Sequence, residues 1–114
     1  MTKQQLSKRQ LQIVEEIRRM LAVEINELLD FNVKNDFLTI MKAVISKDLH
    51  DCKIYYRCSV QNKDIFQTKL DEAKNDISNI IYKKLSMRIR PNLLFVFDNT
   101  IIEIEKIQRI IQNQ

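Results

Sequence analysis

Residues 37–60, FLTIMKAVISKDLHDCKIYYRCSV, constrain the fold most, because their pattern predicts two strands joined by a tight turn. Both flanks are rich in Ile, Val, Tyr, Phe and Thr, the residue types that pack well on a pleated surface. The polar turn Lys47–His50 contains Asp48, whose carboxylate can accept hydrogen bonds from its own backbone. Long helical patterns lie on both sides, so a compact fold has to pack those helices on the sheet of this hairpin.

The second strand of the hairpin alternates between two faces. The face predicted to meet the helices carries Cys52, Ile54 and Tyr56. The opposite face carries Lys53, Tyr55 and Arg57. A tyrosine between two cations can stack on an RNA base while its neighbours hold phosphates. The same pattern is common on any exposed strand, so the residues alone leave both interpretations open.

Two long amphipathic patterns flank the hairpin. The first begins at Ser7–Gln10, whose Ser-x-x-Gln spacing fits a capping box, and is predicted to end near Leu29. Its apolar stripe consists of Val14, Ile17, Leu21, Ile25 and Leu28. The second covers residues 63–85, with an inward stripe of Ile65, Leu70, Ala73, Ile77, Ile80, Ile81 and Leu85. Asn75 and Asp76 are poor helix formers, so this pattern predicts a kink or a break at residues 73–76.

The last part of the chain predicts one more strand and one more helix. Pro91 and Asn92 precede the apolar run Leu93–Phe97, and Asp98–Asn99 stops it. A terminal amphipathic helix follows, with Ile104, Ile107, Ile110 and Ile111 on one side. We expect it to cover the sheet, the alternative being an apolar strip offered to a partner. The 114 residues thus predict one α+β domain over residues 1–114, with a three-stranded sheet and helices packed on one face.

Composition excludes several functional classes. The chain has no glycine, so a P-loop, a dinucleotide-binding fingerprint and the Gly-x-x-Gly loop of ordinary KH domains are absent in their usual form. Cys52 and Cys58 are too far apart on one strand to bridge each other and are expected to be reduced. His50 has no evident partner, and no nucleophile–base pair is apparent, so we expect no catalysis, cofactor or metal. The sequence shows neither a signal peptide nor a membrane-length apolar run, which predicts a cytoplasmic protein.

The formal net charge is +4, and its distribution indicates a polyanionic partner. Residues 37–92 carry eleven basic against six acidic side chains, whereas the flanking segments are nearly balanced. The densest basic patch has no acid among its members and consists of Lys83, Lys84, Arg88 and Arg90. We predict that these side chains contact RNA phosphates, with a second set in Lys53 and Arg57 and further contacts from Lys8 and Arg9.

Two segments are similar to motifs of a known family. Ser46-Lys47-Asp48-Leu49 followed by Cys52-Lys53-Ile54-Tyr55 is similar to a Ser-x-Asp-Leu, Ala-x-Val-Tyr strand–turn–strand. Met87–Leu93 with Phe95, Phe97 and Asp98 is similar to an arginine-flanked Pro-x-Leu-x-Phe-x-Tyr-Asp segment. In this order and spacing, the chain resembles the bacterial ribosome-binding factor A family from about Arg9 to Ile111.

The resemblance implies a type II KH-like fold and a role in assembly of the small (30S) ribosomal subunit. It implies that the protein contacts ribosomal RNA and assists rRNA processing as a monomeric binding factor, without a small-molecule substrate or a membrane. In that family an Ala-x-Gly kink joins two helices. Ala73 and Asn75 stand at this motif, so the alanine matches and Asn75 replaces the glycine.

Two other functions fit the residues. A generic RNA-binding module would bind short single strands and show no preference for a ribosomal subunit. A protein-interaction adaptor using the terminal isoleucine strip would bind with little dependence on salt, because few phosphates would be neutralised.

Overall fold

The computed structural model describes residues 6–29 and 36–112, apart from the side chains of residues 101 and 102. Its elements, in chain order, are α1 (Lys8–Leu29), β1 (Thr39–Ile45), β2 (Asp51–Arg57), the short 3-10 helix η1 (Val60–Asn62), α2 (Lys63–Lys84), β3 (Asn92–Phe97) and α3 (Thr100–Gln112). The predicted order of helices and strands is therefore confirmed.

The three strands form one mixed sheet in the order β1-β2-β3. β1 and β2 pair in antiparallel register through the predicted hairpin turn, and a bulge interrupts the pairing between Ile40 and Lys42. β2 and β3 are parallel, with Ile54 opposite Phe95. A parallel pair needs a long crossover connection, and α2 supplies it.

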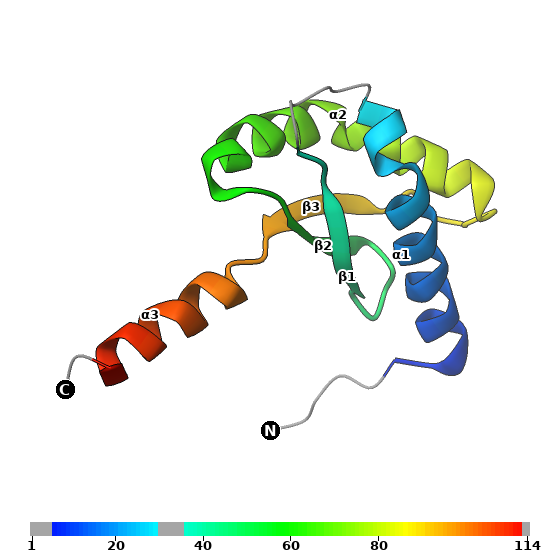
Figure 1. Cartoon of the computed structure of the whole chain (residues 1–114). Coiled ribbons are helices and arrows are strands. Elements are labelled where there is room, and N and C mark those ends of the chain that lie inside the picture. Colours follow the sequence, from blue (N-terminus) through cyan, green and yellow to red (C-terminus); the bar gives the residue numbers. More distant parts are fainter. Residues whose placement is uncertain (1–5, 30–35, 113–114) are drawn as a thin grey trace.

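Helices α1 and α2 lie on the same face of the sheet, as predicted (Figure 1). From α1, the middle of the predicted stripe is fully buried, namely Ile17, Leu21 and Ile25. From β2, the buried residues are those predicted to face the helices, namely Cys52, Ile54 and Tyr56. In α2 the buried residues differ from the predicted stripe, because Phe66 is buried whereas Ile65 is 48% exposed, and because Ser78 is buried as well. This two-layer arrangement is the type II KH-like fold that the family resemblance implies.

The predicted capping box begins α1. The Ser7 N–H donates to Gln10 Oε1 at 2.7 Å, and the Gln10 N–H donates to Ser7 Oγ at 3.1 Å. Each contact satisfies a backbone donor that has no partner within the helix, so these two residues hold the first turn in place.

Of the kink or break expected at residues 73–76, the break does not occur in α2. It runs without a break from Lys63 to Lys84, so Ala73 and Asn75 both lie inside one helix, and Asn75 does not have positive φ. The physical reason is tertiary packing. Leu70, Ile77 and Ile81 are buried on both sides of this point, and their burial outweighs a propensity cost of at most about 0.7 kcal/mol for each poor helix former.

The expectation that the terminal helix covers the sheet is wrong. Helix α3 projects away from the rest of the chain, and every side chain described in it beyond residue 102 is exposed (Figure 1). Its described isoleucine side chains are 48–65% exposed, namely Ile104, Ile107, Ile110 and Ile111. Helices α1 and α2 already cover the apolar face of the sheet, and none of the side chains described in α3 belongs to the core cluster.

Candidate nucleic-acid interface

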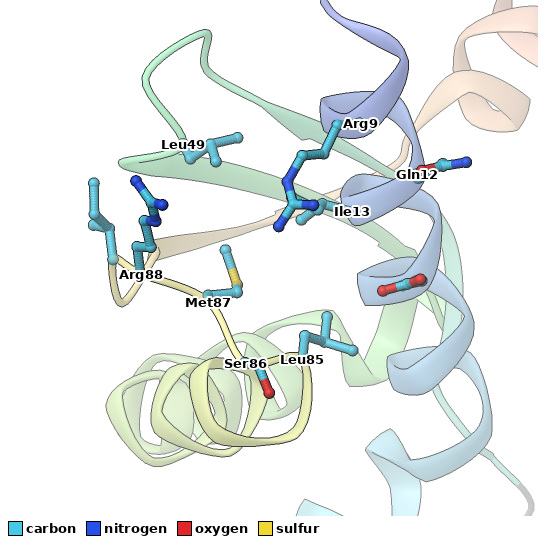
Figure 2. Close-up of a pocket in the computed structure, with 10 residues that line it drawn as sticks. Arg9, Gln12, Ile13, Leu49, Leu85, Ser86, Met87 and Arg88 are labelled. Carbon is cyan, nitrogen blue, oxygen red and sulfur yellow. The ribbon is translucent and has the colours of Figure 1, made fainter.

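The segment after α2 turns sharply because Ser86 adopts a left-handed backbone conformation, with φ of 50°. The Met87 N–H donates to the Tyr82 carbonyl at 3.1 Å, and the Ser86 N–H donates to the Lys83 carbonyl at 3.4 Å. These bonds form a Schellman C-cap, a motif that usually contains glycine at the position of Ser86. The turn directs Met87 and Arg88 back toward α1 (Figure 2).

The hairpin turn is held against the start of α1. The side-chain amide of Gln10 donates to the Lys47 carbonyl, which joins the first turn of α1 to the hairpin. Within the hairpin turn, Asp48 accepts hydrogen bonds from the Ser46 hydroxyl at 2.7 Å and the His50 N–H at 3.1 Å. These contacts lower the pKa of Asp48 and keep it ionised. They also hold Leu49 in a left-handed conformation with φ of 65°.

These three segments enclose a cavity of about 600 Å³, which we call the corner pocket. Its lining residues come from one face of α1, the hairpin turn and the segment after α2, and are Arg9, Gln12, Ile13, Glu16, Leu49, Leu85, Ser86, Met87, Arg88 and Ile89. Figure 2 shows Arg9 and Arg88 extending from opposite sides into the space between α1 and the segment after α2, whereas Gln12 points away. The pocket thus combines apolar side chains with two converging cations.

Among the described residues, neither Arg9 nor Arg88 forms an ion pair. The ion pairs found among the described residues join Arg18 and Arg19 to Glu15, Arg57 to Asp98 and Lys84 to Glu24. Neither arginine of the corner pocket takes part in one. Two unpaired guanidinium groups that face one space favour an anionic ligand there, because Arg presents a fork of donors suited to phosphate.

The remaining predicted RNA contacts fall into two groups. Lys8, Lys83 and Arg90 are exposed and neighbour the pocket residues in the sequence. Lys84 Nζ instead lies 2.8 Å from Glu24 on α1, so its charge is already paired. Ala73 and Asn75 lie in the middle of α2, away from its C-terminal turn, and do not line the corner pocket.

The open face of the sheet carries a separate group of polar side chains. Lys53 is exposed there, and Lys42 on β1 lies over the Tyr55 ring at 4.6 Å from its centroid. Arg57 Nη2 is 3.2 Å from Asp98 Oδ2, and both side chains are partly buried. The structure therefore places Arg57 in an ion pair that joins β2 to the end of β3, and it shows a Lys42–Tyr55 contact that the sequence did not suggest.

Sequence reasoning missed most of the corner pocket. Ile13, Leu49 and Met87 were not candidates, because apolar residues in a charged region look like ordinary core positions. One local pattern could have indicated part of it. Arg9, Ile13 and Glu16 are spaced so that they lie on one face of a helix. The sequence alone could therefore have predicted that a cation, an apolar group and an acid share this face.

Comparison with known proteins identifies the family. The family model for ribosome-binding factor A matches residues 7–111. The chain belongs to the ribosome-binding factor A family. The crystal structure of ribosome-binding factor A from Thermus thermophilus is similar, with a TM-score of 0.64 and 23% sequence identity over 75% of this chain and 92% of the Thermus chain. That structure supports the fold, and the family match supports the resemblance noted from the two motifs.

Within residues 6–29 and 36–112, no group of three or more His, Cys, Asp or Glu side chains is arranged to hold a metal ion. In the same part of the chain, no helix has the length and apolar character needed to cross a membrane. Burial raises the pKa of Cys52 to about 12 and that of Cys58 to about 11, so both thiols stay protonated at neutral pH.

Proposed function

We propose that this protein binds the small ribosomal subunit through ribosomal RNA and assists the assembly of that subunit and the processing of its RNA. The observation that carries the proposal is the corner pocket of a chain of the ribosome-binding factor A family, where Arg9 and Arg88 converge and neither forms an ion pair with another described residue. RNA phosphates are the ligand that such a pair of cations suits best.

The proposed interface extends from the corner pocket over the exposed cations beside it. Lys8 lies next to Arg9 on α1, Lys83 lies on the last turn of α2, and Arg90 follows Arg88. Lys53 adds a weaker contribution from the open sheet face. Lys84 and Arg57 would each have to leave an acidic partner before contacting phosphate, so they contribute least to affinity.

The proposed mechanism is conformational selection in the RNA. A protein that binds one RNA conformation more tightly than another shifts the folding equilibrium of the RNA by that difference in affinity. A difference of about 1.4 kcal/mol corresponds to a tenfold change in population, so a few correctly placed phosphate contacts suffice. Binding alone can therefore promote maturation, and no catalytic group is required.

The test is co-sedimentation of the protein with separated small subunits, large subunits and mature ribosomes over a series of salt concentrations. We expect selective association with the small subunit that weakens as salt rises. The double variant Arg9→Gln/Arg88→Gln should bind more weakly and reduce the slope of log K against log salt by roughly 1.5, because two phosphates are no longer neutralised.

The matched control is Lys106→Gln/Arg109→Gln, which removes the same charge from α3, far from the corner pocket (Figure 1). It should bind like the unmodified protein. Equal binding to all RNA-containing particles would indicate a generic RNA-binding module instead. An adaptor that acts through α3 would show a different result. Its binding would not change with salt concentration and would be lost when Ile104, Ile107 and Ile111 are replaced by serine.

A further inference from the structure

The shape of the corner pocket indicates a ligand larger than a phosphate. A cavity of about 600 Å³ is in the range of pockets that enclose small organic ligands. The apolar lining comes from four side chains that are partly buried and packed against the core, namely Ile13, Leu49, Leu85 and Met87. Because the core holds these side chains in place, they offer preformed apolar contacts to a ligand.

The pocket also contains one acid among its cations. Glu16 lines it from the same face of α1 as Arg9, two helical turns further along. A rise of 1.5 Å per residue separates their backbones by about 10 Å along the axis. An ion pair between these two side chains is not among those formed by the described residues. The pocket therefore presents a cationic end and a separate carboxylate acceptor.

This combination discriminates among nucleobases. Guanine has two adjacent N–H donors on its Watson–Crick edge, which a single carboxylate can accept together, and it has the O6 and N7 acceptors that arginine contacts. Adenine and cytosine each place a ring acceptor beside their amino donor, and uracil places its only N–H between two carbonyls. A carboxylate would meet a lone pair on each of these three bases.

We propose that the corner pocket receives one unpaired guanine nucleotide of the bound RNA. Its base lies on the apolar side chains with its Watson–Crick edge toward Glu16, and Arg9 and Arg88 hold its O6, N7 and phosphate oxygens. The proposal rests on the proposed function and specifies which nucleotide of an RNA the interface selects. Unpaired bases are the parts of an RNA whose edges are free for such recognition.

The test is a titration of the full-length protein, labelled with ¹⁵N, with the 5′-monophosphates of guanosine, adenosine, cytidine and uridine and with inorganic phosphate. Shifts of backbone amide signals report the binding position. We expect guanosine monophosphate to shift the amides of residues 9–16, 49 and 85–89, and to bind at least about fivefold more tightly than the other nucleotides.

The variant Glu16→Gln should reduce the preference for guanosine over adenosine monophosphate by at least about fivefold, because a carboxamide no longer accepts both donors. Glu27→Gln is the control, since Glu27 is exposed on the same face of α1 about three turns away. It should leave the preference unchanged. Arg88→Gln should weaken the binding of all four nucleotides, whereas Arg109→Gln on α3 should leave their binding unchanged.

Equal shifts with all four nucleotides and with phosphate would overturn the proposal, because they would reveal a phosphate contact without base recognition. Shifts located outside the corner pocket would overturn it as well. Either result leaves selective, salt-dependent binding to the small subunit intact. Loss of that binding in the sedimentation experiment would instead overturn the proposed function.

Discussion

At the scale of single residues, two left-handed positions shape the interface of a chain that has no glycine. Leu49 and Ser86 are the non-glycine residues with positive φ in the described part of the chain, and both line the corner pocket. A left-handed conformation costs a non-glycine residue about 1–2 kcal/mol, so the surrounding hydrogen bonds have to hold it. For Ser86 the Schellman C-cap of α2 does so.

This strain predicts that Ser86→Gly stabilises the protein. We expect the free energy of unfolding to rise by about 0.5–1 kcal/mol, because glycine removes the left-handed penalty but also loses more backbone entropy on folding. Chemical denaturation measures the change. Ser59→Gly is the control. Ser59 has φ of −62°, so glycine relieves no strain there, and its greater loss of backbone entropy should lower the free energy of unfolding. A loss of stability in Ser86→Gly would show that the serine side chain matters more than the backbone strain.

At the scale of elements, α3 differs from the other two helices because none of its described side chains belongs to the core. The buried residues of the core cluster lie on α1, α2 and the three strands, together with Leu38 just before β1. A helix of 13 residues is marginal in water when nothing packs against it. The apolar side of α3 is therefore exposed to solvent and does not form a layer of the fold.

We predict that replacing Ile104, Ile107 and Ile111 by serine leaves the free energy of unfolding within about 0.5 kcal/mol of the original value, as expected for exposed positions. Leu21→Ala on α1 is the comparison. Leu21 is fully buried, and its truncation should cost about 2–5 kcal/mol. Urea denaturation of the two variants separates these expectations. A destabilisation of the α3 variant similar to that of Leu21→Ala would mean that α3 packs on the domain in solution.

At the scale of the whole molecule, carboxylates at the connections hold distant segments together. Asp36, just before β1, accepts hydrogen bonds from the Ser59 N–H at 3.1 Å and the Asn62 side-chain amide at 2.8 Å. Partial burial acts to raise the pKa of Asp36, but the hydrogen bonds from Asn62, Ser59 and Phe37 outweigh it and hold the pKa below the ordinary value of 3.8. This carboxylate joins the entry of β1 to the start of α2.

The lowered pKa predicts acid sensitivity. The unfolded chain takes up a proton at Asp36 near pH 3.8, whereas the folded chain takes it up only at a lower pH, so this contribution to stability is complete above 3.8 and is lost as the pH falls through the folded pKa. Asp36→Asn should therefore be less stable than the original protein at pH 7, and the difference should narrow below pH 4. Denaturation curves between pH 7 and pH 2.5 measure it.

The control for this pH series is Asp76→Asn, which changes an exposed carboxylate on α2. Its difference from the original protein should stay small at every pH. A constant gap between Asp36→Asn and the original protein down to pH 2.5 would contradict the assigned role of the ionised carboxylate.

Much of the fold was predictable because its signals are local. The capping box at Ser7 and Gln10, the polar hairpin turn and the alternation of Cys52, Ile54 and Tyr56 each depend on residues a few positions apart. The expectations that the structure does not meet depend on contacts between residues far apart in the sequence. A break in α2 was one of two alternatives suggested by weak helix propensities, and packing of Leu70 and Ile77 overrode them. The terminal helix α3 was expected to cover the sheet, but α1 and α2 already cover its apolar face.

The sequence by itself determined the elements, the core stripes, the family and the basic character of the surface, because periodicity, capping and charge are properties of neighbouring residues. Only the tertiary structure decided which cations are available. It pairs Lys84 with Glu24 and Arg57 with Asp98, and it brings Arg9, Leu49 and Arg88 around one cavity. Those partners are far apart along the chain, so their meeting depends on how α1, the hairpin turn and the segment after α2 pack against one another.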